Sequence, residues 1–135
     1  MSTQNKKFNV RDVMLDTNSF PVVMEADIVK EALDRMDAFG LGIACIKSSD
    51  NRLLGIITDG DVRRKLLSIQ KPLLAFFIDD AINQTVYNPI TVSSDTSLTD
   101  AVVLMEEKQV WDLPVVDEGK LVGLLHLHQA IKKIL

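Results

Sequence analysis

The sequence is poor in cysteine, histidine and aromatic residues. Its 135 residues include one cysteine and two histidines, and phenylalanine, tryptophan and tyrosine together make up 5%. A single cysteine excludes an internal disulfide, and Cys45 lies inside the apolar run LGIACI, which predicts a buried structural thiol. His126 and His128 lack the further ligands that a metal site requires, so no metal is predicted.

A long apolar run and an excess of basic residues are also absent. The longest apolar stretch, PLLAFFI at 72–78, is far too short to span a bilayer, and the polar tail at 1–9 has no apolar signal-peptide core. The formal net charge of −4 argues against a nucleic-acid polymer as partner. We therefore expect a cytoplasmic protein that contacts neither membrane nor nucleic acid.

The common catalytic motifs are missing as well. The sequence has no GxxxxGK[ST] loop, no GxGxxG loop and no nucleophile elbow. Carboxylates and hydroxyls occur in TDGD and SSDTSLTD, but no histidine base lies beside either segment. The sequence therefore predicts no catalytic residues and no enzyme activity for this chain.

What the sequence does contain is an internal repeat. A shift of 68 residues aligns Thr17 with Thr85, Pro21 with Pro89, Asp27 with Asp95 and Gly55 with Gly123. One residue of slippage aligns two sets of apolar residues that share the i, i+3, i+4, i+7 spacing of an amphipathic helix: Val29, Ala32, Leu33 and Met36 with Leu98, Ala101, Val102 and Met105.

Each half is predicted to form a β-α-β-β-α unit, preceded by a short helix at 10–14 or 78–82. The strands are expected at 20–24, 42–47 and 53–58, and again at 89–92, 113–117 and 121–126, with closing helices that begin near Asp61 and Gln129. The predicted boundaries are a first repeat at 10–67, a connector at 68–77 and a second repeat at 78–135. These elements predict the fold class α/β (α+β). Because a repeat of about 58 residues buries little surface alone, the two repeats are expected to pack as a pseudo-twofold pair.

The segment GIITDGDVRR, residues 55–64, ends a strand in polar residues and restarts as a helix. Unpaired backbone N–H groups at a helix start favour a phosphate. Thr58 adds a hydroxyl, Gly60 permits close approach of a ligand, and Asp61 suits the paired hydroxyls of a ribose. The alternative interpretation is that Asp59 or Asp61 only caps the helix.

The two repeats, with LLGIITDGDVRRKL in one and LPVVDEGKLVGLLH in the other, resemble a tandem pair of CBS domains, the Bateman module. The chain is also similar to the C-terminal regulatory region of arabinose 5-phosphate isomerases. In the CBS family a strand ends in Ser or Thr, followed three residues later by Asp, and Thr58 and Asp61 match this signature. The resemblance therefore favours nucleotide binding over a simple cap.

The resemblance implies that an adenine nucleotide, AMP or ATP above all, binds between the repeats as a regulatory ligand, with no obligatory cofactor. Ile56 would pack against the base. Arg63 and Arg64 could both neutralise phosphate charge, but adjacent arginines on a helix point in different directions, so at most one is expected to reach the ligand, and Arg63 is the candidate chosen. The remaining contacts implied by position are Thr85, Asn88, Ile90, Val110 and Trp111. Trp111 has two interpretations, as a stacking face for the purine or as a packing residue.

The second half departs from the signature, since His126 and Gln129 occupy the positions of Thr58 and Asp61. One good site is expected, and a weaker second one stays open. Binding would change the arrangement of the repeats or of a homodimer, with an enzyme domain in cis or in trans as a further partner. Two alternatives remain: the regulatory fragment of a sugar-phosphate isomerase that senses a sugar nucleotide or pathway product, and a dimerisation scaffold without ligand. Whether the chain is free-standing or a fragment is open too.

Overall fold

The computed structural model describes residues 7–68, 70 and 72–135. These residues form two compact units, which divide the chain differently from the sequence repeat. The first unit comprises residues 18–89, and the second unit comprises residues 90–135 together with the N-terminal segment that ends at Thr17. Each unit is described by itself below.

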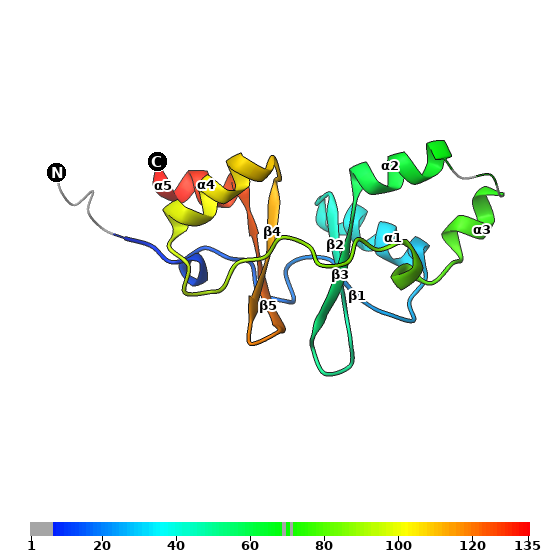
Figure 1. The fold of residues 1–135 in the computed structure, drawn as a ribbon, viewed down its shortest axis with the longest axis horizontal. Coiled ribbons are helices and arrows are strands. Elements are labelled where there is room, and N and C mark those ends of the chain that lie inside the picture. The colour runs from blue at the N-terminus through cyan, green and yellow to red at the C-terminus, as the bar shows by residue number, and fades with distance from the viewer. Residues whose placement is uncertain (1–6, 69, 71) are drawn as a thin grey trace. The chain divides into compact units, whose positions relative to one another are not determined.

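The first unit contains a three-stranded sheet and three α-helices. Its elements are β1 (Val22–Met24), α1 (Val29–Phe39), β2 (Ile43–Lys47), β3 (Leu53–Thr58), α2 (Asp59–Ser68), α3 (Leu73–Phe77) and a 3-10 helix at Ala81–Gln84. The strand order is β1-β2-β3, with β1 parallel to β2 and β2 antiparallel to β3 (Figure 1). Helix α1 ends at Gly40, whose φ of 66° is the left-handed conformation that glycine adopts readily.

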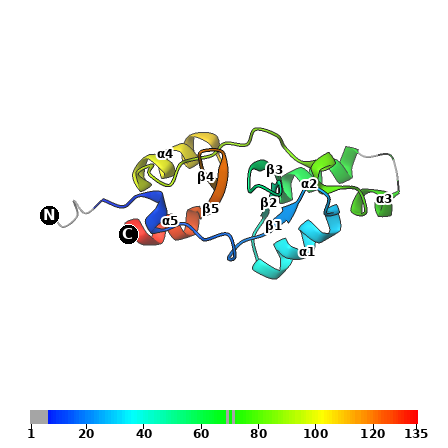
Figure 2. The same ribbon diagram turned by 90° about the horizontal axis from the view of Figure 1, so that it is seen from below.

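The second unit contains an antiparallel hairpin and two helices. Its elements are a 3-10 helix at Val10–Asp12, α4 (Leu98–Lys108), β4 (Asp112–Asp117), β5 (Lys120–His126) and α5 (Leu127–Ile134). Helices α4 and α5 both lie on one side of the β4–β5 hairpin (Figures 1 and 2). Ala101 and Met105 from α4 are buried together with Leu113, Leu125 and Ala130.

The mixed α and β class is confirmed, and most predicted strands lie where the apolar runs placed them. The strand predicted at 89–92 is wrong, because Val92 forms only an isolated parallel bridge with Val115. The short helices predicted at 10–14 and 78–82 are 3-10 turns, since so few residues cannot offset the cost of nucleating an α-helix. The closing helices begin two residues earlier than predicted, at Asp59 and Leu127.

The buried thiol predicted at Cys45 is confirmed, since this side chain in β2 has no solvent exposure. The strand is buried along most of its length, which matches its apolar sequence. The predicted connector contributes Phe76 from α3, which is 1% exposed, while Leu74 beside it is 68% exposed. Part of the connector therefore covers a core, as its composition suggested.

In each unit the last strand of the sheet also bonds to a residue near the start of the other repeat. Ile56 in β3 exchanges backbone hydrogen bonds of 3.1 and 2.8 Å with Val86, and Leu124 in β5 exchanges bonds of 2.8 and 3.0 Å with Leu15. These strands contain Gly55 and Gly123, the glycines that the repeat aligns. A Cβ atom at Gly55 would lie 2.6 Å from the Val86 carbonyl oxygen, and one at Gly123 would lie 2.8 Å from the Leu15 carbonyl oxygen.

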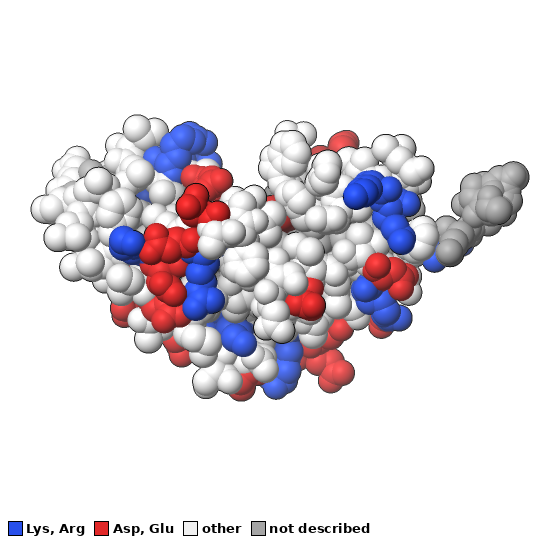
Figure 3. All heavy atoms as spheres, turned by 180° about the vertical axis from the view of Figure 1, so that it is seen from behind, with Lys and Arg blue, Asp and Glu red and all other residues white. Residues whose placement is uncertain are grey.

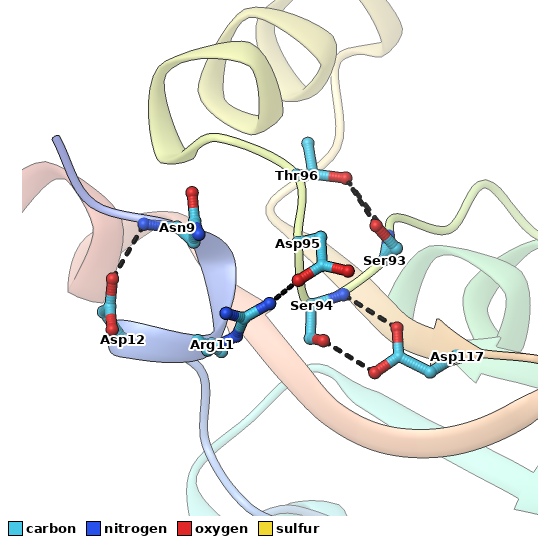
Figure 4. Close-up of polar contacts among 8 residues, drawn as sticks. All are labelled: Asn9, Arg11, Asp12, Ser93, Ser94, Asp95, Thr96 and Asp117. Carbon is cyan, nitrogen blue, oxygen red and sulfur yellow. Dashed lines mark hydrogen bonds and ion pairs between the residues drawn. The ribbon is translucent and has the colours of Figure 1, made fainter.

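The N-terminal segment of the second unit is held by a polar cluster around residues 93–96 (Figure 4). The Val10 N–H donates to the Thr96 carbonyl at 2.8 Å, and Arg11 forms an ion pair with Asp95. In the same cluster the Ser94 N–H and hydroxyl donate to the two carboxylate oxygens of Asp117 at 2.9 and 2.6 Å. These two bonds join the loop before α4 to the end of β4.

The hydrogen bonds from Ser94 lower the pKa of the Asp117 carboxyl below its ordinary value. A lowered pKa in the folded state adds stability above the ordinary pKa, and this stability is lost as the pH falls through the lowered value. Asp117→Asn is therefore expected to reduce the free energy of unfolding at about pH 7, by on the order of 1 kcal/mol after solvent screening, and to have a smaller effect at about pH 3. Urea denaturation at both pH values measures this, with Glu118→Gln as the control for charge removal in the same turn. An equal loss at both pH values would contradict the assignment.

Candidate functional site

The polar turn between β3 and α2 is organised by Thr58 and Asp61. Asp61 Oδ2 accepts hydrogen bonds from the Thr58 N–H at 3.1 Å and from the Thr58 hydroxyl at 2.8 Å. In return the Asp61 N–H donates to Thr58 Oγ1 at 3.2 Å. This reciprocal pattern is a capping box, so the helix cap considered as an alternative is present. The cap also fixes a carboxylate, a hydroxyl and the start of α2 within one turn.

The second oxygen of the Asp61 carboxylate is held by Arg64. The Arg64 guanidinium donates to Asp61 Oδ1 at 2.7 Å, and it lies close to the backbone of Gly60, where a Cβ atom would be 3.2 Å from it. Asp61 is 16% exposed and Arg64 is 62% exposed. Of the two arginines considered from the sequence, Arg63 was chosen, whereas it is Arg64 that bonds to Asp61; the i, i+3 spacing between Asp61 and Arg64 is a signal that could have identified this contact.

Thr85 and Ile56 extend the site within the first unit. The Thr85 hydroxyl donates to the Ile56 carbonyl at 3.0 Å, so that residues 85–86 lie along β3 two residues before Thr58. Asn88, also in this unit, adopts a left-handed φ of 54°. The turn and the segment after the 3-10 helix are thus joined by backbone and side-chain bonds.

The predicted site residues divide between the two units. Seven belong to the first unit: Ile56, Thr58, Gly60, Asp61, Arg63, Thr85 and Asn88. Three belong to the second unit, where Ile90 is 37% exposed and Trp111 is 71% exposed beside Val110. Trp111 therefore offers most of its ring to solvent, which agrees with a binding face better than with a core position.

The equivalent turn in the second unit is built differently. His126 occupies the N-cap position of α5 without a side-chain cap, and its Nδ1 lies 2.8 Å from Asp112 Oδ1 on the paired strand β4. Burial raises the pKa of the Asp112 carboxyl above its ordinary value, and the hydrogen bond with His126 opposes this shift. Gln129 is exposed. The imidazole is thus directed to β4, and no second capping box forms at this turn.

The described residues contain no group of three or more His, Cys, Asp or Glu side chains placed to hold a metal ion. No helix in the described part of the chain is long and apolar enough to cross a bilayer. On the face drawn in Figure 3, basic and acidic side chains lie among each other, and neither sign forms a continuous field.

Curated relatives match most of this chain but only part of their own length. An uncharacterised protein of Chlamydia pneumoniae is 34% identical over 127 residues, which are 91% of this chain and 38% of that protein. The arabinose 5-phosphate isomerase of Francisella tularensis is 30% identical over 125 residues, which are 91% of this chain and 36% of the isomerase. The chain thus spans less than two fifths of the length of these relatives.

Among solved structures, CBSX2 in complex with AMP is 25% identical, with a TM-score of 0.81 over 93% of this chain and 95% of that one. The CBS domain family matches residues 10–68 and 81–135, which together are most of the sequence. The chain belongs to the CBS domain family and is a tandem CBS pair, a regulatory module whose similarity extends to arabinose 5-phosphate isomerases.

Proposed function

We propose that this CBS pair binds an adenine nucleotide at the turn between β3 and α2 and acts as a sensor without catalysis. The observation that carries the proposal is the Thr58–Asp61 pair at the start of α2, which holds a carboxylate beside backbone N–H groups. A carboxylate suits the two hydroxyls of a ribose, and a helix start suits a phosphate. The AMP complex of CBSX2, which shares this fold, supports the choice of ligand class.

Arg64 is proposed to control access to Asp61. Its guanidinium occupies the carboxylate oxygen that faces away from Thr58, so a ribose hydroxyl must replace it there. Once displaced, the mostly exposed guanidinium is free to neutralise phosphate charge near Gly60. Arg64 thereby takes the role that the sequence gave to Arg63, and it favours a nucleotide over the uncharged nucleoside.

The signal would leave the site through residues 85–88. Thr85 and Val86 are bonded to Ile56, so a ligand that moves β3 or its turn also moves the segment that leads to the second unit. A ligand changes such an equilibrium only by its different affinity for the two states. We propose that the readout is the arrangement of the repeats in a homodimer, or an attached enzyme domain.

A second candidate ligand follows from the isomerase relatives, of which this chain matches about a third. If the chain acts as the regulatory part of a sugar-phosphate isomerase, its ligand is a sugar nucleotide or a pathway product. A dimerisation scaffold without ligand is the third candidate. The same titration separates all three.

Asp61→Asn is expected to weaken nucleotide binding about tenfold, the equivalent of about 1.4 kcal/mol. Asparagine keeps one acceptor oxygen for the cap but loses the second acceptor that a ribose needs. Isothermal titration with AMP, ADP, ATP, S-adenosylmethionine and a cytidine sugar nucleotide measures the change. Asp59→Asn is the matched control, because it removes the same charge from the same helix start.

Three results would decide between the candidates. Tight binding of one adenine nucleotide, weakened by Asp61→Asn and not by Asp59→Asn, supports the sensor. Preference for the cytidine sugar nucleotide supports the isomerase fragment. If the folded protein binds none of these compounds, the proposal fails and the scaffold is favoured.

A further inference from the structure

The end of α2 and the short helix α3 expose a cluster of large apolar side chains in the first unit. The five exposed members are Leu66, Leu67, Leu73, Leu74 and Ile78, and Leu67 and Leu74 are 80% and 68% exposed. Residues 69–72 alone separate the two helices, which lie at the same end of this unit in Figures 1 and 2. Exposed apolar clusters on a folded domain mark a contact with another protein or with a membrane.

The outer side of α2 carries apolar and basic side chains together. Val62 packs against the core of the first unit, so the opposite side of the helix faces solvent. Leu67 lies on this outer side, four residues after Arg63 and three after Arg64, and the three side chains are therefore neighbours. Lys65 beside them is exposed as well. Exposed apolar side chains beside basic ones are typical of helices that lie on an anionic membrane surface.

Helix α3 contributes an apolar outer side. Phe76 is buried, whereas Leu74 and Ile78 lie on the other side of the helix, four residues apart. The Ile78 N–H donates to the Leu74 carbonyl at 3.1 Å, which continues the helical spacing as far as Ile78. More than half of each of these two side chains is open to solvent within the unit, so both are available to a partner.

The charge of this segment favours one kind of partner. Residues 62–78 contain four basic residues and no acidic one, although the whole chain has a net charge of −4. A second copy of the same segment would bring basic side chains together, which disfavours self-association here. Nucleic-acid binding relies on phosphate contacts and gives the exposed leucines no role. An anionic lipid surface matches both features, because its headgroups attract the basic side chains and its acyl boundary takes up the leucines.

The surface that we call the α2–α3 face consists of Leu66, Leu67, Leu73, Leu74 and Ile78 together with Arg63, Arg64 and Lys65. We propose that the α2–α3 face binds reversibly to an anionic membrane surface. Such a contact requires no helix that crosses the bilayer, so the short apolar runs on which the expectation of no membrane contact rested do not exclude it. The contact goes beyond nucleotide sensing. Helix α2 begins at the Thr58–Asp61 turn and ends in this face, so one helix joins the proposed nucleotide site to the lipid contact.

Leu67→Gln combined with Leu74→Gln is expected to weaken binding to anionic vesicles by at least about tenfold, because two leucines no longer enter the interface. Co-sedimentation with vesicles of phosphatidylcholine and phosphatidylglycerol in equal amounts measures the affinity. Vesicles of phosphatidylcholine alone should bind the wild-type protein far more weakly. Ile134→Gln is the matched control and should leave binding unchanged, since Ile134 is exposed and follows Lys132 and Lys133 but lies in the second unit. Both leucines are exposed, so the double variant should unfold in urea as the wild type does.

Lys65→Gln tests the contribution of charge to the same contact. It is expected to weaken binding to the anionic vesicles about fivefold, the equivalent of about 1 kcal/mol for one basic residue near the surface. Lys108→Gln is its control, because it removes an exposed lysine from α4 in the second unit. Added salt should weaken the binding of the wild-type protein, since it screens the attraction to the headgroups.

Several results would overturn the proposal. They are a wild-type protein that binds neither kind of vesicle, equal binding to both kinds, or an equal loss in Ile134→Gln. If the leucine variant breaks up an oligomer without changing vesicle binding, the face is a protein contact and the proposal is wrong. Nucleotide titration of the leucine variant separates this contact from the sensor, because neither leucine belongs to the proposed nucleotide site and its nucleotide affinity should be that of the wild type.

Discussion

Gly55→Ala is expected to lower the free energy of unfolding by about 2–3 kcal/mol, because the added methyl group has no space. Its Cβ atom would lie 2.6 Å from both Thr85 Oγ1 and the Val86 carbonyl oxygen. The threonine hydroxyl can rotate away, but the carbonyl is part of the backbone that bonds to Ile56. The methyl group must therefore push residues 85–86 off β3.

Gly123→Ala is the equivalent change in the second unit and is expected to have a similar or smaller effect. The Cβ atom would meet Met14 Sδ at 2.6 Å and the Leu15 carbonyl oxygen at 2.8 Å, and the methionine side chain is flexible enough to yield. The expected local result is release of residues 7–17 from β5, seen as faster cleavage by a protease in that segment. Urea denaturation gives the stability of both variants.

The same substitution at Gly60 is the control, because it is not expected to lower the free energy of unfolding. Gly60 lies in the first turn of α2, and a Cβ atom there meets only the end of the flexible Arg64 side chain, at 3.2 Å. Alanine favours a helix over glycine by up to about 1 kcal/mol, so Gly60→Ala should be neutral or stabilising. A loss below about 0.5 kcal/mol in Gly55→Ala would contradict the close approach of residues 85–86.

The alignment of Gly55 with Gly123 shows how far the sequence could predict the fold. The spacing of apolar residues and the turn-forming residues predicted most strands, and the internal repeat identified the two glycines as equivalent. The sequence could not show why both positions need glycine. Residues 85–86 lie against Gly55 and residues 14–15 lie against Gly123, and each of these segments is distant in sequence from the glycine that it contacts. The alignment of the repeats assigns residues 14–15 to the first repeat and residues 85–86 to the second. In the structure each segment belongs to the compact unit formed mainly by the other repeat.

The candidate site was predictable to a similar extent. The spacing of Thr58 and Asp61 predicted their common turn, since three residues separate an N-cap from the residue that closes a capping box. The contact of Arg64 with Asp61 depends on a rotamer that no spacing rule fixes. The orientation of His126 depends on the register of β4 and β5, which brings Asp112 opposite it. Both contacts depend on the folded structure and not on sequence spacing alone.

His126→Ala is expected to lower the free energy of unfolding by about 2–3 kcal/mol at about pH 7. It leaves Asp112, whose side chain is 9% exposed, without the imidazole that lies 2.8 Å from its carboxylate. An unpaired buried charge costs more than the pair contributes, and the figure is set below that for a fully buried pair because His126 is 24% exposed. The pKa of the Asp112 carboxyl, already raised by burial, should rise further.

The loss should depend on pH with a defined sign. A pKa raised in the folded state means that the folded protein holds the proton more tightly, so stability is greatest below the ordinary pKa of aspartate and falls as the pH rises through the raised value. The difference between wild type and His126→Ala should therefore be small at about pH 3 and large at about pH 7. In the wild-type protein the contribution of the Asp112 carboxyl falls as the pH rises, whereas that of Asp117 grows, although both substitutions are expected to cost most at about pH 7.

His128→Ala is the control, since this imidazole lies two residues further along α5 and is exposed. Adding Asp112→Asn to His126→Ala should recover much of the stability lost at about pH 7, because a neutral amide costs less to bury than an unpaired carboxylate. Urea denaturation of these variants across the acid range would show it. If His126→Ala lost the same stability at every pH, the imidazole would act by packing and not by holding a buried charge. If the loss depends on pH as expected, the turn of the second repeat contains a structural pair of His126 and Asp112, because the imidazole at the position of Thr58 bonds to β4.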